Sequence, residues 1–421
     1  MQTTKITVSI ITIGDELLIG QTIDTNSAWM ASELNKIGVW VKRRVAVGDN
    51  REDIWQALDH ESNEADIILI TGGLGPTADD ITKPLLCDYF GGKMIVNEEV
   101  LQHVTTIFRR LNRPLIERNL KQAEVPDVCE VLMNERGTAP GMLFRKGKKV
   151  FISMPGVPHE MKGLMSNKVL PLLQTEFQMP FILHRTLLTA GVGESFIAEK
   201  IQSWEEALPE AVKLAYLPNY GMVRLRLTTQ TNEKEKAEQE LDRLFVELQE
   251  QVKEWLIIDK DLSLEKALGD LLISKNKSLS TAESCSGGYI AHLLTSVPGS
   301  SLYFKGTVVA YSYDAKETIL GVNHSTLETK GAVSEETITE MFNGLMNVTT
   351  ADYGIATSGI MGPGGGTDDK PVGTVWVAVG SRDKMVAKRL QFRFDRAKNI
   401  ELTATNALLM LFQFVKAEVS S

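Results

Sequence analysis

The chain has 421 residues, of which 43% are hydrophobic and 24% are charged, and its formal net charge at pH 7 is −9. This length allows two or three domains with substantial cores. The acidic balance disfavours nonspecific binding to nucleic acid, so we expect no nucleic-acid partner and favour small-molecule chemistry. The cysteines, Cys87, Cys129 and Cys285, are odd in number and lack CxxC spacing, which argues against a disulfide framework and a zinc site.

The longest early apolar stretch, 6–13, is interrupted by Thr7, Ser9 and Thr12 and has no basic segment before it. It therefore reads as a buried first strand and not as a signal peptide. No run is long and apolar enough for a membrane span. We expect a cytoplasmic protein without a membrane partner.

Strand and helix patterns alternate from residue 5 to about residue 170. Three apolar, β-branched runs stand in this part of the chain: 6–13, 39–47 and 67–71. This alternation is typical of a parallel α/β sheet. Polar or glycine-rich loops follow all three strands, beginning at Asp15, Gly48 and Gly72. Because the carboxyl ends of parallel strands meet at one edge, we expect a shared cleft there.

From about residue 181 the pattern changes to a βαββαβ order. The expected elements are strand 181–190, helix 194–204, strands 212–217 and 222–229, helix 232–255 and strand 256–259. The turn 218–221 joins the two central strands as a hairpin, and the order predicts a small α+β module of ferredoxin-like or KH type. Arg224 and Arg226 alternate with apolar residues, which indicates a solvated strand face, with RNA contact as the minor alternative.

A second α/β pattern runs from about residue 262 to the end. It comprises helix 262–275, strand 278–281, helix 287–296, strand 305–311, helix 315–320, helix 334–348, strands 353–358, 373–380 and 385–394, and helix 396–417. We therefore expect three domains, covering 1–172, 173–260 and 261–421.

The run 281–288, Thr-Ala-Glu-Ser-Cys-Ser-Gly-Gly, is the most informative stretch of the third domain. Its position predicts a strand-to-helix turn that presents Ser284 just before a helix N-terminus, where free N–H groups stabilise developing negative charge. The alternative is that Ser284 or Ser286 only caps the helix. Cys285 is a competing nucleophile, which we disfavour because no histidine is placed to activate it.

Ser284 needs a base if it is to attack a carbonyl. His292 lies eight residues along the expected helix, about 12 Å of rise, and His324 stands in a polar loop, so a Ser-His-Asp triad is poorly supported. Lys316 is the better partner, because the apolar strand end 308–313 could bury its amine and lower its pKa. The alternative is that Lys316 is an exposed helical lysine.

A second glycine-rich segment, 357–366, follows the expected strand 353–356. Glycines permit positive φ and close backbone approach, so successive N–H groups can form a cradle for a phosphate. Arg396 could add a fork of donors for the same phosphate. A flexible surface loop is the alternative.

These motifs carry a resemblance to a known family. The segments AESCSGG, AYSYDAK, TSGIMGPGGG and KPVGTVW closely resemble the CinA C-terminal domain, the PncC family of nicotinamide-mononucleotide amidohydrolases. The upstream segments GDELLIGQTIDTNS, TGGLGPTADDITK, NERGTAPGM and SMPGVPHEM look like the CinA N-terminal domain, which is related to the molybdopterin-binding fold. The resemblance covers essentially the whole chain, in family order.

For the third domain the resemblance implies deamidation of nicotinamide mononucleotide to nicotinate mononucleotide and ammonia, without a cofactor. Ser284 would be the nucleophile, with Lys316 and Tyr311 as activating and proton-relaying neighbours. The expected substrate-binding residues here are Gly287, Gly288, Thr357, Ser358, Gly359, Gly362 and Arg396. Our own inference gives the Gly287 and Gly288 amides to an oxyanion hole, whereas Ser358 and Arg396 would hold the ribose phosphate. The chain departs from the family at Ser286, where threonine is frequent, and at Phe394, where a glycine commonly precedes the Asp-Arg pair.

For the first domain the resemblance implies cleavage of ADP-ribose to AMP and ribose 5-phosphate, with a divalent metal such as Mg²⁺. Acidic loop residues supply hard oxygen ligands, and the candidates are Asp15, Glu16, Asp24, Asp49, Asp79 and Asp80. Of these we favour Asp15, Asp49 and Asp80 as metal ligands, although each could instead be a cap or a turn former. The expected substrate contacts are the amides of Gly72, Gly73 and Gly75 and the side chain of Asn26.

Two other readings stay open. The first domain could bind a molybdopterin-type cofactor, or the whole protein could be a non-enzymatic competence or DNA-damage accessory protein. From the family resemblance we also expect a homodimer.

Overall fold

The computed structural model describes residues 6–77 and 80–420. The chain divides into two compact units. One consists of Met1–His184, Pro209–Lys213 and Thr228–Arg243, and the other of Arg185–Leu208, Leu214–Leu227 and Leu244–Ser421. The division passes through the middle module, whose strands contribute to both units.

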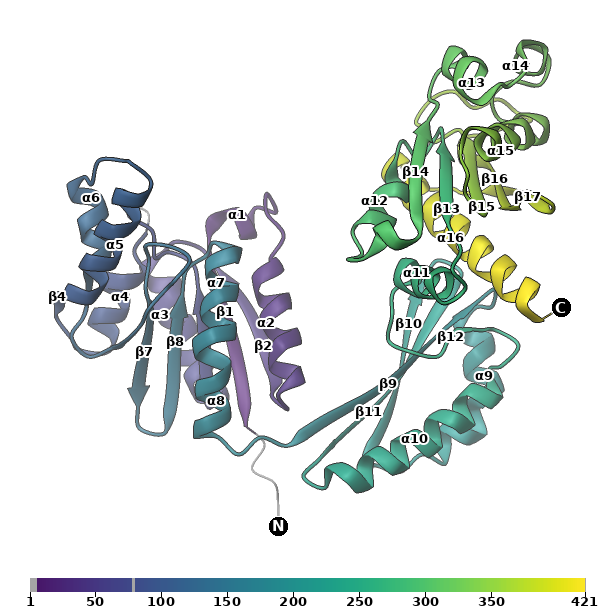
Figure 1. Ribbon diagram of the computed structural model, residues 1–421. Coiled ribbons are helices and arrows are strands. Elements are labelled where there is room, and N and C mark those ends of the chain that lie inside the picture. Colours follow the sequence, from purple (N-terminus) through teal and green to yellow (C-terminus); the bar gives the residue numbers. More distant parts are fainter. Residues whose placement is uncertain (1–5, 78–79, 421) are drawn as a thin grey trace. The chain divides into compact units, whose positions relative to one another are not determined.

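The N-terminal part of the first unit is built on a six-stranded sheet with the order β2-β1-β3-β8-β7-β6 (Figure 1). Its strands are β1 (Thr7–Ile13), β2 (Trp40–Val47), β3 (Ile67–Thr71), β6 (Glu130–Leu132), β7 (Gly141–Lys146) and β8 (Lys149–Met154). The sheet is parallel across β2, β1, β3 and β8, as the sequence predicts. It differs from the expected all-parallel sheet at one edge, where β7 and β6 run antiparallel, because the short connection from β7 to β8 forms a hairpin and leaves no room for a crossover helix.

Helices cover both faces of this sheet. They are α1 (Asp15–Leu18), α2 (Thr25–Lys36), α3 (Arg51–Glu64), α4 (Thr82–Tyr89), α5 (Glu98–Arg110), α6 (Glu117–Leu120), α7 (Pro158–Leu164) and α8 (Leu170–Glu176), with a small ribbon of β4 (Met94–Val96) and β5 (Glu124–Pro126) beside them. Val8 and Ile10 pack in one cluster with α2, α7 and α8, and Ile11 and Ile13 in another with α3 and α4. Burial of both faces explains why β1 carries apolar side chains on each of its faces.

The middle module has the βαββαβ order that the sequence predicts. Its elements are β9 (Phe181–Ala190), α9 (Glu194–Glu206), β10 (Val212–Asn219), β11 (Met222–Thr231), α10 (Lys234–Gln251) and β12 (Leu256–Ile258), and the sheet order is β10-β11-β9-β12. Val223, Leu225 and Leu227 are buried along β11. The hairpin between β10 and β11 turns at Tyr220 and Gly221, whose φ angles are 41° and 81°.

The C-terminal domain is built on a five-stranded sheet with the order β14-β13-β15-β16-β17 (Figure 1). The strands are β13 (Leu279–Glu283), β14 (Phe304–Val309), β15 (Tyr353–Gly359), β16 (Thr374–Ser381) and β17 (Met385–Gln391), and the helices are α11 (Leu264–Ser274), α12 (Tyr289–Thr295), α13 (Tyr313–Leu320), α14 (His324–Lys330), α15 (Glu335–Val348) and α16 (Arg396–Ser420). Helices α11, α12 and α16 pack on one face, and α13, α14 and α15 on the other.

One helix, α14, stands where the sequence suggested a polar loop around His324. Leu327 is buried in this helix and packs in the same cluster as Leu320 and Ile338. The packing of Leu327 and the 2.8 Å hydrogen bond from the Thr326 hydroxyl to Glu340 of α15 hold this short segment, and no sequence period marks it.

The register of the C-terminal sheet brings two loops together. Strands β14, β13 and β15 are parallel, so the loops that follow them leave the same edge. Glu283 pairs with Thr357 in this register, and the amide of Ser284 donates to the Thr357 carbonyl over 3.0 Å. The turn after β13 therefore lies beside the glycine-rich loop after β15.

Candidate active site

A serine and a lysine are in direct contact at this edge of the C-terminal sheet. The Nζ of Lys316 donates to the Oγ of Ser284 over 2.9 Å. It also donates to the carbonyl oxygens of Ala310, over 2.8 Å, and Tyr311, over 3.2 Å. Both side chains are buried, with exposed fractions of 8% for Ser284 and 1% for Lys316. The arrangement places an amine within proton-transfer distance of a hydroxyl.

The start of α13 brings Lys316 into this position. The hydroxyl of Ser312 caps the helix by accepting the amide of Ala315 over 3.1 Å, which sets the first helical turn. Lys316 then faces the sheet, so the alternative of an exposed helical lysine is wrong. Burial lowers the pKa of Lys316, because a desolvated amine favours its neutral form.

The turn that carries Ser284 needs its two glycines because both adopt positive φ angles. Gly287 and Gly288 have φ angles of 61° and 96°, which side-chain-bearing residues rarely adopt. The expected oxyanion hole does not form from them, because the Gly287 amide donates to the Ser284 carbonyl and the Gly288 amide donates to a carboxylate of Glu283. Among the described backbone–backbone hydrogen bonds, none is donated by the amides of Cys285 and Ser286.

Glu283 organises the turn, and the sequence reasoning missed it. Its fully buried carboxylate accepts the amides of Gly288, Ile290 and Ala291 over 3.0, 3.1 and 2.9 Å. The hydroxyl of Thr281 also donates to it, over 3.2 Å. An acidic residue directly before a Ser-x-x-Gly-Gly turn is the signal that could have revealed it, since a carboxylate there can accept the N–H groups of the following helix.

Cys285 is not set up as a nucleophile. It is buried, and burial raises the pKa of its thiol to about 12. A thiol in this state carries almost no thiolate at neutral pH. The hydroxyl of the next residue, Ser286, hydrogen-bonds the Thr357 hydroxyl over 2.8 Å, so these two side chains tie the turn to the glycine-rich loop.

Arg396 connects the glycine-rich loop with the segment after β14. Its guanidinium donates to the Gly362 carbonyl over 3.0 Å and to the Tyr311 phenol oxygen over 2.9 Å. Tyr311 is 61% exposed; its phenol contacts Arg396, and its carbonyl accepts from Lys316. The structure thus brings Tyr311, Gly362 and Arg396 together, with the phenol bonded to the arginine.

The two residues at the end of β15 have local structural contacts. Ser358 is buried and donates its hydroxyl to the Ala332 carbonyl over 2.7 Å, so this hydroxyl is already used as a donor. At Gly359 a Cβ atom would lie 2.9 Å from the Thr374 carbonyl, which explains the glycine by strand packing. Only the acceptor capacity of Ser358 is left for a ligand.

The acidic residues predicted for a metal in the N-terminal domain do not form one cluster. Asp15 and Asp49 lie side by side, since each carboxylate accepts the other residue's amide over 3.1 Å. Asp80 instead accepts the amides of Gly75 and Thr77, over 2.7 and 2.8 Å, and acts as a turn former. Asp79 lies outside the described residues. Within 6–77 and 80–420, no three His, Cys, Asp or Glu side chains are grouped as metal ligands, so the predicted three-carboxylate set does not fit a metal ion.

The glycines after β3 permit close packing. A Cβ atom at Gly72 would lie 2.2 Å from the Ile13 carbonyl, and one at Gly73 would lie 2.0 Å from the Thr82 hydroxyl. The amide of Gly72 donates to the Met154 carbonyl, and that of Gly75 donates to Asp80. Two of the three amides expected to bind phosphate are therefore already used within the protein.

A cavity of about 130 Å³ lies at the carboxyl ends of β1 and β3. Its polar lining includes Thr12, Glu16, Asp24, Asn26 and Thr71. The amide nitrogen of Asn26 donates to the Gly156 carbonyl over 2.8 Å, whereas its Oδ1 is buried and has no hydrogen-bond partner. An unpaired buried acceptor is costly, so this oxygen favours a ligand that brings a donor.

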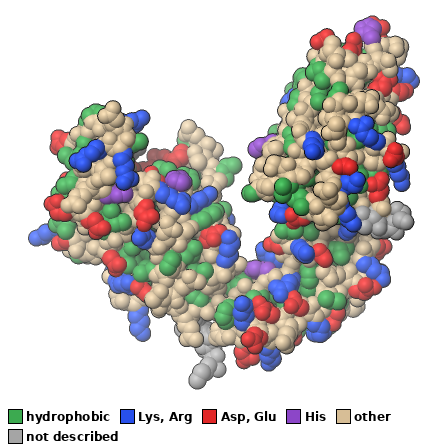
Figure 2. Space-filling view, viewed as in Figure 1, with side chains coloured by type: hydrophobic (Ala, Val, Ile, Leu, Met, Phe, Trp, Pro, Cys, Tyr) green, Lys and Arg blue, Asp and Glu red, His purple; other side chains and the backbone are tan. Residues whose placement is uncertain are grey.

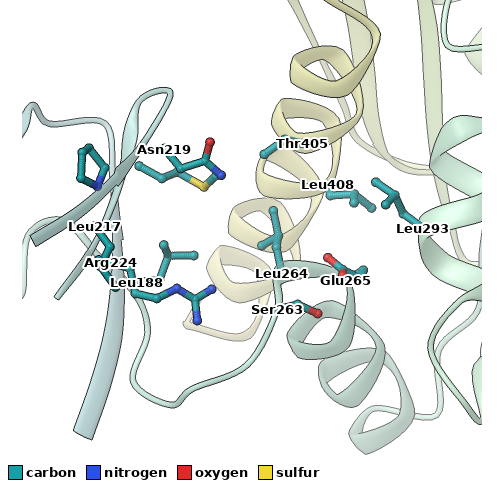
Figure 3. Close-up of a pocket in the computed structure, with 12 residues that line it drawn as sticks. Leu188, Leu217, Asn219, Arg224, Ser263, Leu264, Glu265, Leu293, Thr405 and Leu408 are labelled. Carbon is teal, nitrogen blue, oxygen red and sulfur yellow. The ribbon is translucent and has the colours of Figure 1, made fainter. Parts of the chain in front are cut away.

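A larger cavity, of about 400 Å³, lies between the β10–β11 hairpin and helices α11, α12 and α16 (Figure 3). Leu188, Leu217, Leu264, Leu293 and Leu408 supply most of its apolar lining. Its polar residues do not pair a nucleophile with a base, so we place the candidate chemistry at Ser284 and not in this cavity.

The surface and the helices add two further observations. Basic and acidic side chains are interspersed over the visible face in Figure 2. None of the helices in the described part of the chain is long and apolar enough to cross a bilayer.

Three family models match the chain in succession. "Probable molybdopterin binding domain" matches residues 9–175, "Damage-inducible protein CinA KH domain" matches 184–257, and "CinA C-terminal domain" matches 261–415. These are the family and the fold types that the sequence motifs predict.

Relatives of full length are also similar. A CinA-like protein of Flavobacterium psychrophilum is 44% identical over 407 residues, which cover 96% of this chain and 97% of the relative. A CinA-like protein of Cytophaga hutchinsonii is 44% identical over 414 residues, covering 98% and 99%. A solved CinA superfamily protein of Klebsiella pneumoniae is 34% identical and covers 37% of this chain and 96% of its own, with a TM-score of 0.36. By its near-complete match to these relatives, the chain belongs to the CinA family, with a molybdopterin-binding-like domain, a KH-like module and a CinA C-terminal domain.

Proposed function

We propose that the C-terminal domain hydrolyses the carboxamide of nicotinamide mononucleotide to give nicotinate mononucleotide and ammonia. The observation that carries this proposal is the 2.9 Å contact between the buried Lys316 amine and the Ser284 hydroxyl. A serine with an adjacent neutral amine is an activated nucleophile for acyl transfer. The chemistry needs no cofactor.

In the first half-reaction the Ser284 Oγ attacks the carboxamide carbon, and its proton passes to the neutral Lys316 Nζ. A C–O bond forms, and negative charge develops on the carbonyl oxygen. When the tetrahedral intermediate collapses, the C–N bond breaks, and the Lys316 ammonium returns the proton to the departing nitrogen. Ammonia leaves, and the acyl group remains as an ester of Ser284.

In the second half-reaction Lys316 takes a proton from water, whose oxygen attacks the ester carbon. Collapse then breaks the bond to Ser284, and the lysine ammonium reprotonates the serine oxygen. The amides of Cys285 and Ser286 replace those of Gly287 and Gly288 as our candidate oxyanion donors, because neither donates in a described backbone–backbone hydrogen bond.

Arg396 is the candidate for the ribose phosphate, with Thr357, Ser358, Gly359 and Gly362 forming the neighbouring loop. Its planar fork of donors suits a phosphate, and its present acceptors are neutral oxygens that a phosphate could replace. Because the Tyr311 phenol is bonded to Arg396, we assign Tyr311 to orienting this arginine and, through its carbonyl, Lys316.

For the N-terminal domain we propose hydrolysis of ADP-ribose to AMP and ribose 5-phosphate. The unpaired Oδ1 of Asn26 in the cavity beside β1 and β3 supports a ligand with hydrogen-bond donors, which the ribose hydroxyls of ADP-ribose supply. A molybdopterin-type cofactor would also bring donors, and AMP formation separates the two readings. No step of this proposal passes through a metal, since the predicted ligand set does not form.

Removal of either member of the Ser-Lys pair should stop deamidation. We expect Ser284→Ala and Lys316→Arg each to lower kcat by roughly 10²-fold to 10⁴-fold or more, because the first lacks the nucleophile and the second stays protonated. Ammonia release from nicotinamide mononucleotide is the measurement, and unchanged AMP formation from ADP-ribose would show that the loss is confined to the C-terminal domain. Undiminished ammonia release by Ser284→Ala would place the nucleophile elsewhere, and no release by the unaltered protein would favour the accessory-protein reading.

The pH dependence of deamidation should follow Lys316. Its pKa is lowered by burial, so the amine becomes neutral at a lower pH than an ordinary lysine with a pKa of about 10.4. Only the neutral amine accepts the Ser284 proton, so kcat should rise with pH and level off above this lowered pKa. A kcat that falls as the pH rises, or that rises only near the ordinary lysine pKa of about 10.4, would contradict the role of the buried Lys316 as the base.

Glu283→Gln should disturb the turn without touching the reacting atoms. In this variant an N–H donor of glutamine faces backbone amides that donate to the carboxylate in the unaltered protein. We therefore expect kcat to fall by about tenfold to a hundredfold. This loss corresponds to the roughly 1.5–3 kcal/mol that hydrogen bonds to a charged group contribute. Glu335→Gln, at an exposed position in the first turn of α15, is the matched control and should behave like the unaltered protein. If Glu283→Gln retained full kcat, the turn would not depend on this carboxylate.

Asn26→Ala should reduce AMP formation from ADP-ribose by about tenfold, because a hydrogen bond to the ligand is worth roughly 0.5–1.5 kcal/mol and its amide also holds the Gly156 carbonyl. Ammonia release should stay unchanged, since the substitution lies in the other unit. Asn63→Ala, on the exposed side of α3, serves as the control. Equal AMP formation by Asn26→Ala and the control would remove Asn26 from the proposed site.

A further inference from the structure

The tip of the β10–β11 hairpin contacts the segment that carries Arg396. The ring of Tyr220 meets that of Phe394 edge to face, with centroids 5.0 Å apart and an interplanar angle of 84°. The Nζ of Lys398 lies 4.1 Å from the centroid of the same Tyr220 ring. One tyrosine of the middle module thus contacts the residues that stand two positions before and two positions after Arg396.

The same segment is connected to the glycine-rich loop. The fully buried Asn399 donates its amide to the carbonyls of Phe394, over 2.9 Å, and Met361, over 3.1 Å. Arg396 adds its own bond to the carbonyl of Gly362. The position of the guanidinium relative to the loop therefore depends on how the backbone from 394 to 399 is held.

The hairpin is also anchored to the C-terminal domain by Met222, which is buried in one core cluster with Leu264 and Leu408. The 400 Å³ cavity lies on one side of it, where Leu217 and Asn219 face Leu264 and Thr405 (Figure 3). A second cavity, of about 350 Å³, is lined by Tyr220 and Gly221 together with residues of β17 and α16. With space on both sides, the Tyr220 ring is a discrete link from the hairpin tip to the Arg396 segment.

We propose that Tyr220 is a positioning residue for Arg396, so that the middle module sets how tightly the C-terminal site holds the phosphate of its substrate. This inference rests on the proposed deamidation of nicotinamide mononucleotide. Aromatic and cation–π contacts restrict the segment from 394 to 398 and hold the guanidinium near Gly362 and Tyr311 before substrate arrives. Preorganisation of this kind lowers the cost of binding and leaves the chemistry at Ser284 and Lys316 unchanged.

The test is steady-state deamidation by the full-length chain carrying Tyr220→Ala. The KM for nicotinamide mononucleotide should rise roughly fivefold to tenfold with kcat unchanged, the loss expected for one aromatic pair and one exposed cation–π contact. The separate variant Tyr220→Phe keeps the ring and should have the KM of the unaltered protein. Nicotinamide riboside lacks the phosphate. As a competitive inhibitor it should therefore have the same inhibition constant for the unaltered protein and for Tyr220→Ala.

Phe394→Ala gives an independent route to the same link. It should raise KM as Tyr220→Ala does, and the double variant should show less than the product of the two single effects, because both remove one contact. Phe196→Ala removes an aromatic side chain of the same module that is 67% exposed, and it should leave KM unchanged. This control separates the hairpin contact from a general effect of trimming the module's surface.

The outcomes separate the two proposals. If the unaltered protein releases no ammonia from nicotinamide mononucleotide, the proposed function fails and this inference fails with it. If the unaltered protein is active and Tyr220→Ala has the same KM, or lowers kcat instead of raising KM, the positioning role of Tyr220 is overturned while the deamidase assignment stands.

Discussion

The burial of the Lys316 amine beside the Ser284 hydroxyl is the interaction on which the C-terminal site depends. An ammonium group in this position would lose most of its hydration, and the surrounding acceptors are a hydroxyl and two backbone carbonyls with no carboxylate among its described partners. Desolvation therefore favours the neutral amine, which is the form that can accept a proton. The capped start of α13 and the end of β14 are the elements that impose this burial.

The turn around Ser284 shows how one carboxylate can change the use of a helix N-terminus. A helix start with free N–H groups is an anion site, and that argument led to Gly287 and Gly288 as oxyanion donors. Glu283 already occupies the position of the anion, since it accepts three amides of the turn and of α12. The helix start thus stabilises the turn that presents Ser284, and the amides of Cys285 and Ser286 are the ones that donate in no described backbone–backbone hydrogen bond.

In the N-terminal domain, too, groups of the protein itself occupy positions where a ligand was expected. Gly72 and Gly73 have the positive φ angles expected of a phosphate-binding loop, yet the atoms that approach them are the Ile13 carbonyl and the Thr82 hydroxyl of the protein itself. Asp80 likewise closes a loop of the chain. The feature that favours a ligand in this domain is the buried, unpaired oxygen of Asn26, which the sequence offered as a substrate contact beside the three glycine amides.

The sequence by itself determined the succession of α/β, βαββαβ and α/β segments and the family, because these rest on local patterns: strand and helix periods and glycines at turns. It suggested Lys316 as the partner of Ser284 from the apolar strand end before it, but left open that Lys316 is exposed and that Ser284 only caps a helix. It could not determine which amides stay free, which carboxylates meet, or what contacts Arg396. Those properties arise between residues far apart in the chain, such as Ser284 with Thr357, Asp15 with Asp49, and Tyr220 with Phe394. A hydrogen-bonding group has many possible partners, and only the packed structure selects one of them.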